Sequence, residues 1–196
     1  YSRRLVGVEV LAILVAVGFL APFYFVIVNS VKPFGEILRN AAALPQEVTL
    51  ANYANAWREV RFPVVLVNSL IVTTFSIAGM VLLGSMAAWR MVRRPHRVSK
   101  VLFVLFVAAM VIPFQSVMIP MVKVAKVLGL INSLPGVVII YFGFGLPLTG
   151  FLLHGFVKGV PKELEESAYI DGCTTFQSFF RIVFPLLRVM IVTVVI

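Results

Sequence analysis

Long apolar runs separated by short polar or basic segments dominate this chain. A helix needs roughly 20 mostly apolar residues to cross a bilayer. Four runs reach that length, and a fifth begins close to the end of the sequence: 5–28, 64–89, 101–121, 134–156 and from about 179 onward. None of them alternates apolar and polar residues in short strands, as a membrane β-barrel would. The pattern therefore predicts an all-α, polytopic bundle of transmembrane helices.

Composition supports a membrane location. Hydrophobic residues make up 61% of the 196 positions and charged residues 13%, with a mean hydropathy of +1.03. Soluble domains carry about 45–50% apolar and about 25% charged residues. The net charge of +9 falls in short clusters between the apolar runs, which indicates topology rather than nucleic-acid binding. One cysteine, Cys173, and two histidines, His96 and His154, favour neither a disulfide nor a metal site.

Basic residues predict the orientation of the spans. The segment 90–100 contains five basic residues and no acid, which places it in the cytoplasm by the positive-inside rule. The N-terminus, with Arg3 and Arg4, is then cytoplasmic as well, and 29–63 is external. Alternation makes 158–181 cytoplasmic. The run 5–28 is longer than the apolar region of a cleavable signal and is interpreted as a retained span.

Prolines divide both the external loop and the spans. Within 29–63 they leave room for one short interfacial helix, at 52–59. Four prolines fall inside spans, where each removes a backbone donor and is expected to kink its helix: Pro22, Pro113, Pro147 and Pro185. Kinked spans suit a pathway that opens and closes, and they equally suit ordinary packing.

The most informative segment is 160–187, which is predicted to form two short helices joined by a tight turn. Pro161 suits a first helical position. Leu164 and Ala168 lie four residues apart and are expected to share a face. The first turn holds three acids that the positive helix end stabilises: Glu163, Glu165 and Glu166.

The turn between these two helices has a sequence signature of its own. Gly172 stands where a left-handed residue ends a helix. Thr174 followed by Gln177 is a capping-box pattern for the next helix. By itself, the segment is interpreted either as a plain interfacial helix or as a docking element whose acidic side faces a partner.

The same residues resemble the EAA loop of inner-membrane permease subunits of binding-protein-dependent ABC importers. The matching triplets are Glu166-Ser167-Ala168, Asp171-Gly172-Cys173 and Phe184-Pro185-Leu186. Further matches resemble the carbohydrate branch, which contains the maltose-type permeases: Val160–Leu164, Asn68–Thr73, Leu128–Ser133, and Asn52-Tyr53 with Trp57.

The resemblance implies the fold of a type-1 ABC importer transmembrane domain, with six spans when complete and about four and a half present here. Residues 1–63 would supply the first span and an external loop. Residues 64–196 would form the transporter core, with the coupling loop at about 158–181. Because the chain starts at Tyr1 and stops inside an apolar run, we expect it to be a C-terminally truncated piece.

The resemblance also implies a mechanism, in which the short helix docks in a cleft of a cytoplasmic ATPase. Glu166 would pair with a basic group there, Gly172 would permit the bend, Asp171 would cap or brace it, and Ala168 would keep the packing close. The full coupling set is Glu163, Glu166, Ser167, Ala168, Asp171 and Gly172. No phosphate-cradling glycine-rich loop is encoded, so we expect no cofactor on this chain, no catalytic residue, and ATP with Mg²⁺ on the ATPase.

The function implied is half of an import pathway for a sugar or oligosaccharide in a prokaryotic inner membrane. Its partners would be two ATP-binding subunits, a second and different permease, an extracellular solute-binding protein and membrane lipid. One alternative is another cargo: a peptide, amino acid, polyamine, polyol, glycerol phosphate or inorganic ion. Another is a membrane-embedded enzyme, although no Ser/His pair or carboxylate dyad lies inside the spans. Asn68, Gln115 and Ser116 either line the pathway or hydrogen-bond between helices.

Overall fold

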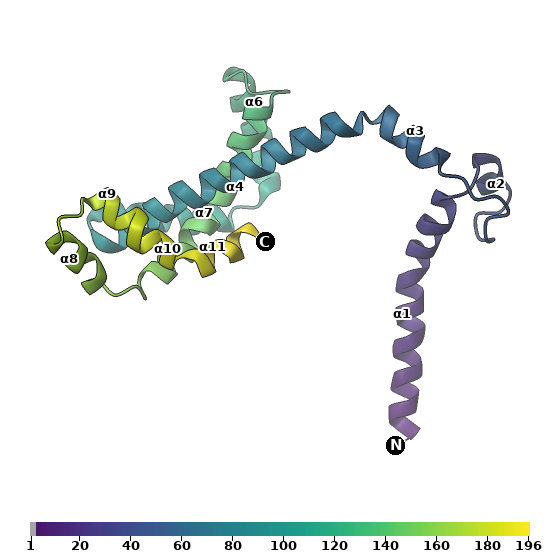
Figure 1. The fold of residues 1–196 in the computed structure, drawn as a ribbon, viewed down its shortest axis with the longest axis horizontal. Coiled ribbons are helices and arrows are strands. Elements are labelled where there is room, and N and C mark those ends of the chain that lie inside the picture. Colours follow the sequence, from purple (N-terminus) through teal and green to yellow (C-terminus); the bar gives the residue numbers. More distant parts are fainter. Residues whose placement is uncertain (1–2) are drawn as a thin grey trace. The chain divides into compact units, whose positions relative to one another are not determined.

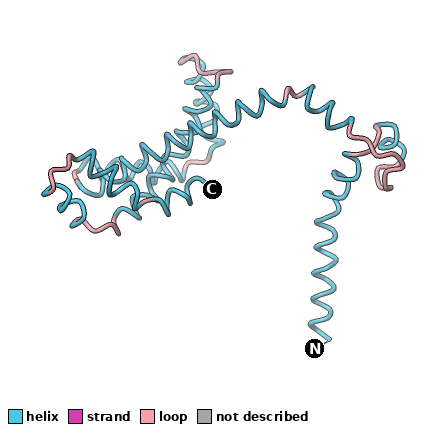
Figure 2. Tube along the Cα trace, in the orientation of Figure 1, coloured by secondary structure: helices cyan, strands magenta, loops and turns pink. Residues whose placement is uncertain are grey.

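The computed structural model describes residues 3–196, with side chains from Leu5 onward, so the Arg3 and Arg4 side chains of the orientation prediction lie outside it. The described residues form helices joined by loops and turns, and none of them lies in a strand (Figure 2). The all-α prediction is therefore confirmed. The chain separates into two compact units, one ending at Val67 and the other covering Asn68–Ile196.

The first unit contains the first predicted span and the loop that follows it. Helix α1 (Arg3–Ser30) includes a 26-residue apolar stretch that is long enough to cross a membrane, and it continues through Pro22. Helix α3 (Ala51–Glu59) confirms the short helix predicted at 52–59. Helix α2 (Phe34–Arg39) was not predicted. Pro33 directly precedes it, so this proline begins a helix rather than breaking one.

The second unit is built around two long spans, labelled in Figure 1. Helix α4 (Phe62–Arg93) extends the predicted span 64–89 at both ends, and α7 (Leu134–Val157) matches the prediction 134–156. Helix α7 stays a single helix through Pro147. Ser133 caps its start, since the Ser133 Oγ accepts a hydrogen bond from the Gly136 N–H at 3.2 Å.

The span predicted over 101–121, with a kink expected at Pro113, is divided into two separate helices in the structure. The structure has α5 (Arg97–Val111) and α6 (Phe114–Val127), with a bend of 108° at the break between them. Pro113 favours this break, because it donates no backbone hydrogen bond and pushes the residue before it toward extended backbone. Ile112 accordingly has a ψ of 119°. Among the described residues, three single helices are thus long and apolar enough to span a membrane, or up to five if each bent pair is one span.

The C-terminal part is a succession of short helices. It comprises α8 (Glu163–Ile170), α9 (Thr175–Ser178), a π-helical turn η1 (Phe179–Val183), α10 (Phe184–Leu186) and α11 (Arg188–Val195). The stretch predicted to start a fifth span near 179 therefore begins at Thr175. It bends by 68° between Leu186 and Arg188, just after Pro185.

Packing in the second unit is concentrated where α4, α7 and the C-terminal helices meet. The buried cluster draws on all three: Ala88, Leu153, Val157, Val160, Phe179, Val183 and Leu187. Helix α5 also packs along α7. Most other large apolar side chains are exposed, as expected for spans whose natural surroundings are lipid. This core holds the end of α4 next to the segment that carries α8.

Candidate functional site

Helix α8 begins and ends where local chemistry dictates. Its N-cap is Lys162, so Pro161 lies before the helix, and the prediction that it occupies the first helical position is wrong. At the other end Gly172 has a φ of +84°. The N–H of Cys173 donates to the Ala168 carbonyl at 2.9 Å, and the Gly172 N–H donates to the Tyr169 carbonyl at 3.1 Å. This pair of bonds is the Schellman motif, so the left-handed helix end predicted at Gly172 is confirmed.

The capping box predicted for the next helix is also confirmed. The Thr174 Oγ1 accepts from the Gln177 N–H at 3.3 Å, and the Gln177 Oε1 accepts from the Thr174 N–H at 2.8 Å. Two otherwise unpaired donors at the start of α9 are thereby satisfied. The turn between α8 and α9 is thus fixed from both sides by short-range hydrogen bonds.

The faces of α8 differ from the sequence prediction. Leu164 is 44% exposed, whereas Ala168 is 6% exposed, so these two residues do not share a buried face. The buried positions are Glu165 and Ala168, three residues apart. The remaining predicted coupling residues on α8, Glu163, Glu166 and Ser167, are exposed. The structure therefore divides the three acids of the first turn into two that face outward and one that faces the core.

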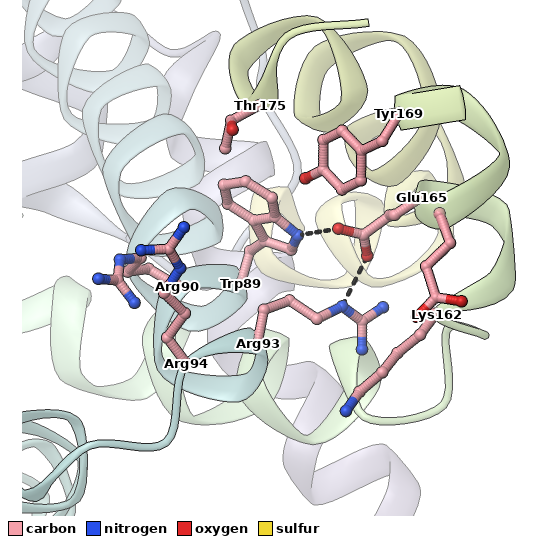
Figure 3. A pocket seen from close by; sticks show the side chains of 9 residues that line it. Trp89, Arg90, Arg93, Arg94, Lys162, Glu165, Tyr169 and Thr175 are labelled. Atoms are coloured by element: carbon pink, nitrogen blue, oxygen red, sulfur yellow. Dashed lines mark hydrogen bonds and ion pairs between the residues drawn. The ribbon is translucent and has the colours of Figure 1, made fainter. Parts of the chain in front are cut away.

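Glu165 binds the end of α4 through both of its carboxylate oxygens (Figure 3). The Arg93 Nε donates to Oε1 at 2.6 Å, and the Trp89 Nε1 donates to Oε2 at 2.8 Å. Arg93 also donates from Nη2 to the Val160 carbonyl at 2.8 Å. We call this set of Trp89, Arg93, Val160 and Glu165 the α4–α8 clasp.

The clasp is largely removed from water. The side chains of Arg93 and Glu165 are 12% and 5% exposed. Charge-assisted hydrogen bonds of this length are about twice as strong as neutral ones. A buried pair does not always add net stability, but removing one member leaves the other charged and unpaired. Helix α8 is therefore fixed to α4 by specific contacts as well as by the chain that connects α7 to it.

Sequence reasoning missed the clasp. It interpreted Arg93 only as one member of the basic 90–100 segment, and it treated Glu165 like its neighbours in the first turn of α8. A cavity of about 730 Å³ opens beside the clasp (Figure 3). Its lining carries four basic and two acidic side chains: Trp89, Arg90, Arg93, Arg94, Lys162, Glu165, Glu166, Tyr169 and Thr175.

The other predicted site residues lie elsewhere. Asp171 is the C-cap of α8, and its N–H donates to the Ser167 carbonyl at 3.0 Å. Asn68 is half-buried in α4, whereas Gln115 and Ser116 are exposed in the first turn of α6, directly after the Pro113 break. Their assignment to a pathway stays a prediction.

Fold and site together define a polytopic helical membrane protein that carries a short acidic helix clasped to the end of one of its spans. Residues 80–196 match the family model described as binding-protein-dependent transport system inner membrane component. This match covers more than half of the chain, so the protein belongs to that family and is a multi-pass protein of the inner membrane.

Curated relatives extend the similarity beyond this region. The chain is 39% identical over 179 residues to the probable starch degradation products transport system permease protein AmyC of Thermoanaerobacterium thermosulfurigenes, which covers 91% of the chain and 65% of that relative. It is 33% identical over 188 residues to the melibiose/raffinose/stachyose import permease protein MelC of Bacillus subtilis, covering 95% of the chain and 68% of that protein. The chain thus spans about two thirds of the length of these relatives.

A solved structure has the same fold. The crystal structure of a bacterial ABC transporter involved in the import of the acidic polysaccharide alginate matches the whole chain with a TM-score of 0.77. The match covers 70% of the transporter chain at 20% sequence identity. This likeness establishes the transmembrane-domain fold and confirms the predicted fold class.

Proposed function

We propose that this protein is a permease subunit of an ATP-driven importer and forms half of a translocation pathway for a sugar or oligosaccharide. Family membership supports the transport role. The names of several relatives specify sugar cargo, including starch degradation products, melibiose, diacetylchitobiose and trehalose. The matches of the sequence to the carbohydrate branch support the same class of substrate.

The α4–α8 clasp is the observation that carries the proposal. On the buried side of α8, Glu165 holds the helix against α4. Glu163, Glu166 and Ser167 of the same helix are exposed. A partner that binds the exposed side therefore acts on a helix that is rigidly connected to a 32-residue span. We propose that α8 is the coupling helix of the transporter and that Glu166 pairs with a basic group of the ATPase.

The proposed assembly follows from the membrane orientation that the basic residues predict. The basic segment 90–100 and α8 lie in the cytoplasm, together with the N-terminus. Two ATP-binding subunits bind there and hold ATP and Mg²⁺, so the chain itself needs no cofactor. A second, different permease completes the pathway. An extracellular solute-binding protein delivers the sugar on the side of residues 29–63.

Uptake and association measurements test the coupling role. The full-length protein is reconstituted in liposomes with its partner permease, ATPase and binding protein, and uptake of a panel of radiolabelled sugars and non-sugar solutes is measured. We expect Glu166→Lys and Gly172→Asp to reduce both uptake and ATPase association. The matched control is Glu59→Lys, an exposed acid at the end of α3. Normal uptake by both Glu166→Lys and Gly172→Asp would refute coupling through α8.

Cys173 provides an independent test of orientation because it is the only cysteine of the sequence and adjoins Gly172. A membrane-impermeant maleimide should label it in inverted membrane vesicles and not in right-side-out vesicles. The control is an Ala42→Cys/Cys173→Ser variant, which should show the opposite pattern. Labelling of Cys173 from the outside would overturn the proposed topology.

A further inference from the structure

A second cavity, of about 640 Å³, shares Arg93 and Lys162 with the cavity beside the α4–α8 clasp. It is formed where the turn between α4 and α5 meets the end of α7 and the start of the segment leading to α8. Its lining combines basic and apolar side chains and includes no acid: Met91, Val92, Arg93, Pro95, Ser99, Lys100, Phe103, Val104, His154, Lys158 and Lys162.

The charge at this cavity is of one sign. Glu165 neutralises Arg93 at 2.6 Å, which leaves Lys100, Lys158 and Lys162. All three are exposed, and over residues 5–196 the Arg93–Glu165 pair is the one salt bridge that the structure contains. Figure 3 shows the Lys162 side chain extending away from the Glu165 carboxylate. The three lysines therefore present positive charge that the described part of the chain does not neutralise.

The floor of the cavity is apolar. The ring of Phe103 lies against the ring of His154, with centroids 4.1 Å apart. Val104 is 62% exposed beside it, and Met91 and Val92 close the floor from α4. The cavity thus has a cationic rim, and an apolar surface that continues onto the exposed side of α5. A ligand that fits both parts has an anionic head and a hydrocarbon body.

The position of the cavity is that of a lipid headgroup. It lies at the polar ends of α4 and α7 and at the start of α5, where these apolar helices pass into basic segments. Ser99, in the first turn of α5, is one of its lining residues, so the positive end of that helix dipole also adjoins the site. Basic pockets between membrane helices at this level bind anionic lipid headgroups.

We propose that this cavity binds an anionic phospholipid, with the phosphate among Lys100, Lys158 and Lys162 and an acyl chain against Phe103 and Val104. An acidic protein segment would satisfy the lysines, but it would leave the apolar floor without a partner. The proposal depends on the chain spanning a membrane. It does not depend on which solute is carried or on coupling through α8.

Native mass spectrometry of the full-length protein, purified in detergent and offered phosphatidylglycerol or phosphatidylcholine, tests the site. We expect retained phosphatidylglycerol and no retained phosphatidylcholine. Because an interfacial lysine changes anionic lipid binding by roughly fivefold, the Lys100→Gln/Lys158→Gln/Lys162→Gln variant should weaken phosphatidylglycerol affinity by about 100-fold. Replacing the same lysines by arginine should preserve it.

Three further variants make the test specific. Lys100→Gln/Lys158→Gln leaves Lys162, the N-cap of α8, unchanged and should weaken binding by about 25-fold. Val104→Trp fills the cavity without changing its charge and should also reduce retention. Lys123→Gln/Lys126→Gln removes two exposed lysines of α6 and should leave retention unchanged.

Two outcomes would overturn the proposal. One is equal phosphatidylglycerol retention by the wild-type protein and the triple glutamine variant. The other is a triple variant that keeps its lipid but no longer binds the ATPase subunits, which would assign the lysines to an acidic protein surface. Because lipid retention is measured without nucleotide or sugar, failure of the transport proposal would not change the result.

Discussion

The Glu165 carboxylate and the Arg93 guanidinium lie 2.6 Å apart although 72 residues separate them in the chain. Helices α5, α6 and α7 lie between them in sequence. The same carboxylate also accepts the Trp89 N–H, so one acidic side chain contacts two residues that are one helical turn apart on α4. In a family that operates at the inner membrane, this contact connects a short surface helix to a span.

Removal of either partner of this ion pair should destabilise the protein. In Glu165→Ala the Arg93 guanidinium loses its counter-charge in a site that is 12% exposed. Breaking a buried pair in this way costs about 3 kcal/mol of unfolding free energy. Denaturant titration of the full-length protein in detergent micelles measures this loss of unfolding free energy. The matched control is Glu163→Ala in the same helical turn, which is exposed and should change the free energy by no more than about 0.5 kcal/mol.

A double-mutant cycle separates the pair from its surroundings. If the two charges stabilise each other, Arg93→Met/Glu165→Met should cost about 1–3 kcal/mol less than the sum of the two single variants. Additive single effects would contradict the clasp, because each side chain would then act alone. ATPase activity without sugar uptake in Glu165→Gln would further indicate that the clasp transmits motion.

The bend after α8 should depend on the backbone of Gly172 and not on space around it. Its φ is +84°, and a Cβ placed there meets no atom within 4 Å. Gly172→Ala should therefore cost about 1 kcal/mol of unfolding free energy from left-handed strain alone. Gly172→Asn should cost less. Gly155→Ala is the control, since that glycine is helical and equally open, and it should gain about 0.5 kcal/mol. Equal effects at both positions would contradict this explanation.

Features governed by local chemistry could be predicted from the sequence. The long spans α1, α4 and α7 follow from apolar length. The C-terminal end of α8 follows from Gly172 and the start of α9 from the Thr174–Gln177 capping box, and the contacts of both reach no more than five residues along the chain. A resemblance in the same segment indicated the family that residues 80–196 match.

Features set by tertiary contacts could not be predicted. Whether Pro113 kinks a span or divides it depends on what α5 and α6 pack against, and hydropathy is the same in both cases. The three acids in the first turn of α8 look alike in sequence, and only the fold brings Glu165 to Arg93. The basic segment 90–100 was therefore assigned to topology alone, although one of its arginines is structural.

Close approach of α5 and α7 should make Gly150 intolerant of a side chain. A Cβ at Gly150 would lie 2.5 Å from the Cε2 of Phe106 and 2.7 Å from its Cδ2, so the ring would have to move. Overpacking of this kind costs about 1–3 kcal/mol. We expect Gly150→Ala to lower the unfolding free energy by that amount. The control is Gly143→Ala in the same helix, where a Cβ meets nothing within 4 Å. A neutral Gly150→Ala would show that the ring relaxes freely.

The loop after α1 has a buried charge at its centre. Lys32 is fully buried, and its Nζ donates to the carbonyls of Asn40, at 3.1 Å, and of Ala41 and Ala43. The Asn52 Nδ2 in turn donates to the Lys32 carbonyl at 2.7 Å. The Lys32 ammonium thus binds three carbonyls of the turn that follows α2. It takes the place of the water that these carbonyls would otherwise bind.

Lys32→Met should therefore loosen this loop and leave the second unit unchanged. Each hydrogen bond to a charged donor contributes about 1.5–3 kcal/mol, and the freed carbonyls would have to find water. Hydrogen–deuterium exchange of the full-length protein should accelerate at residues 40–49, with no change in α4 or α7. Arg39→Met, an exposed cation on α2, is the control and should leave exchange as it is. Unchanged protection at 40–49 in Lys32→Met would show that the ammonium does not organise the loop.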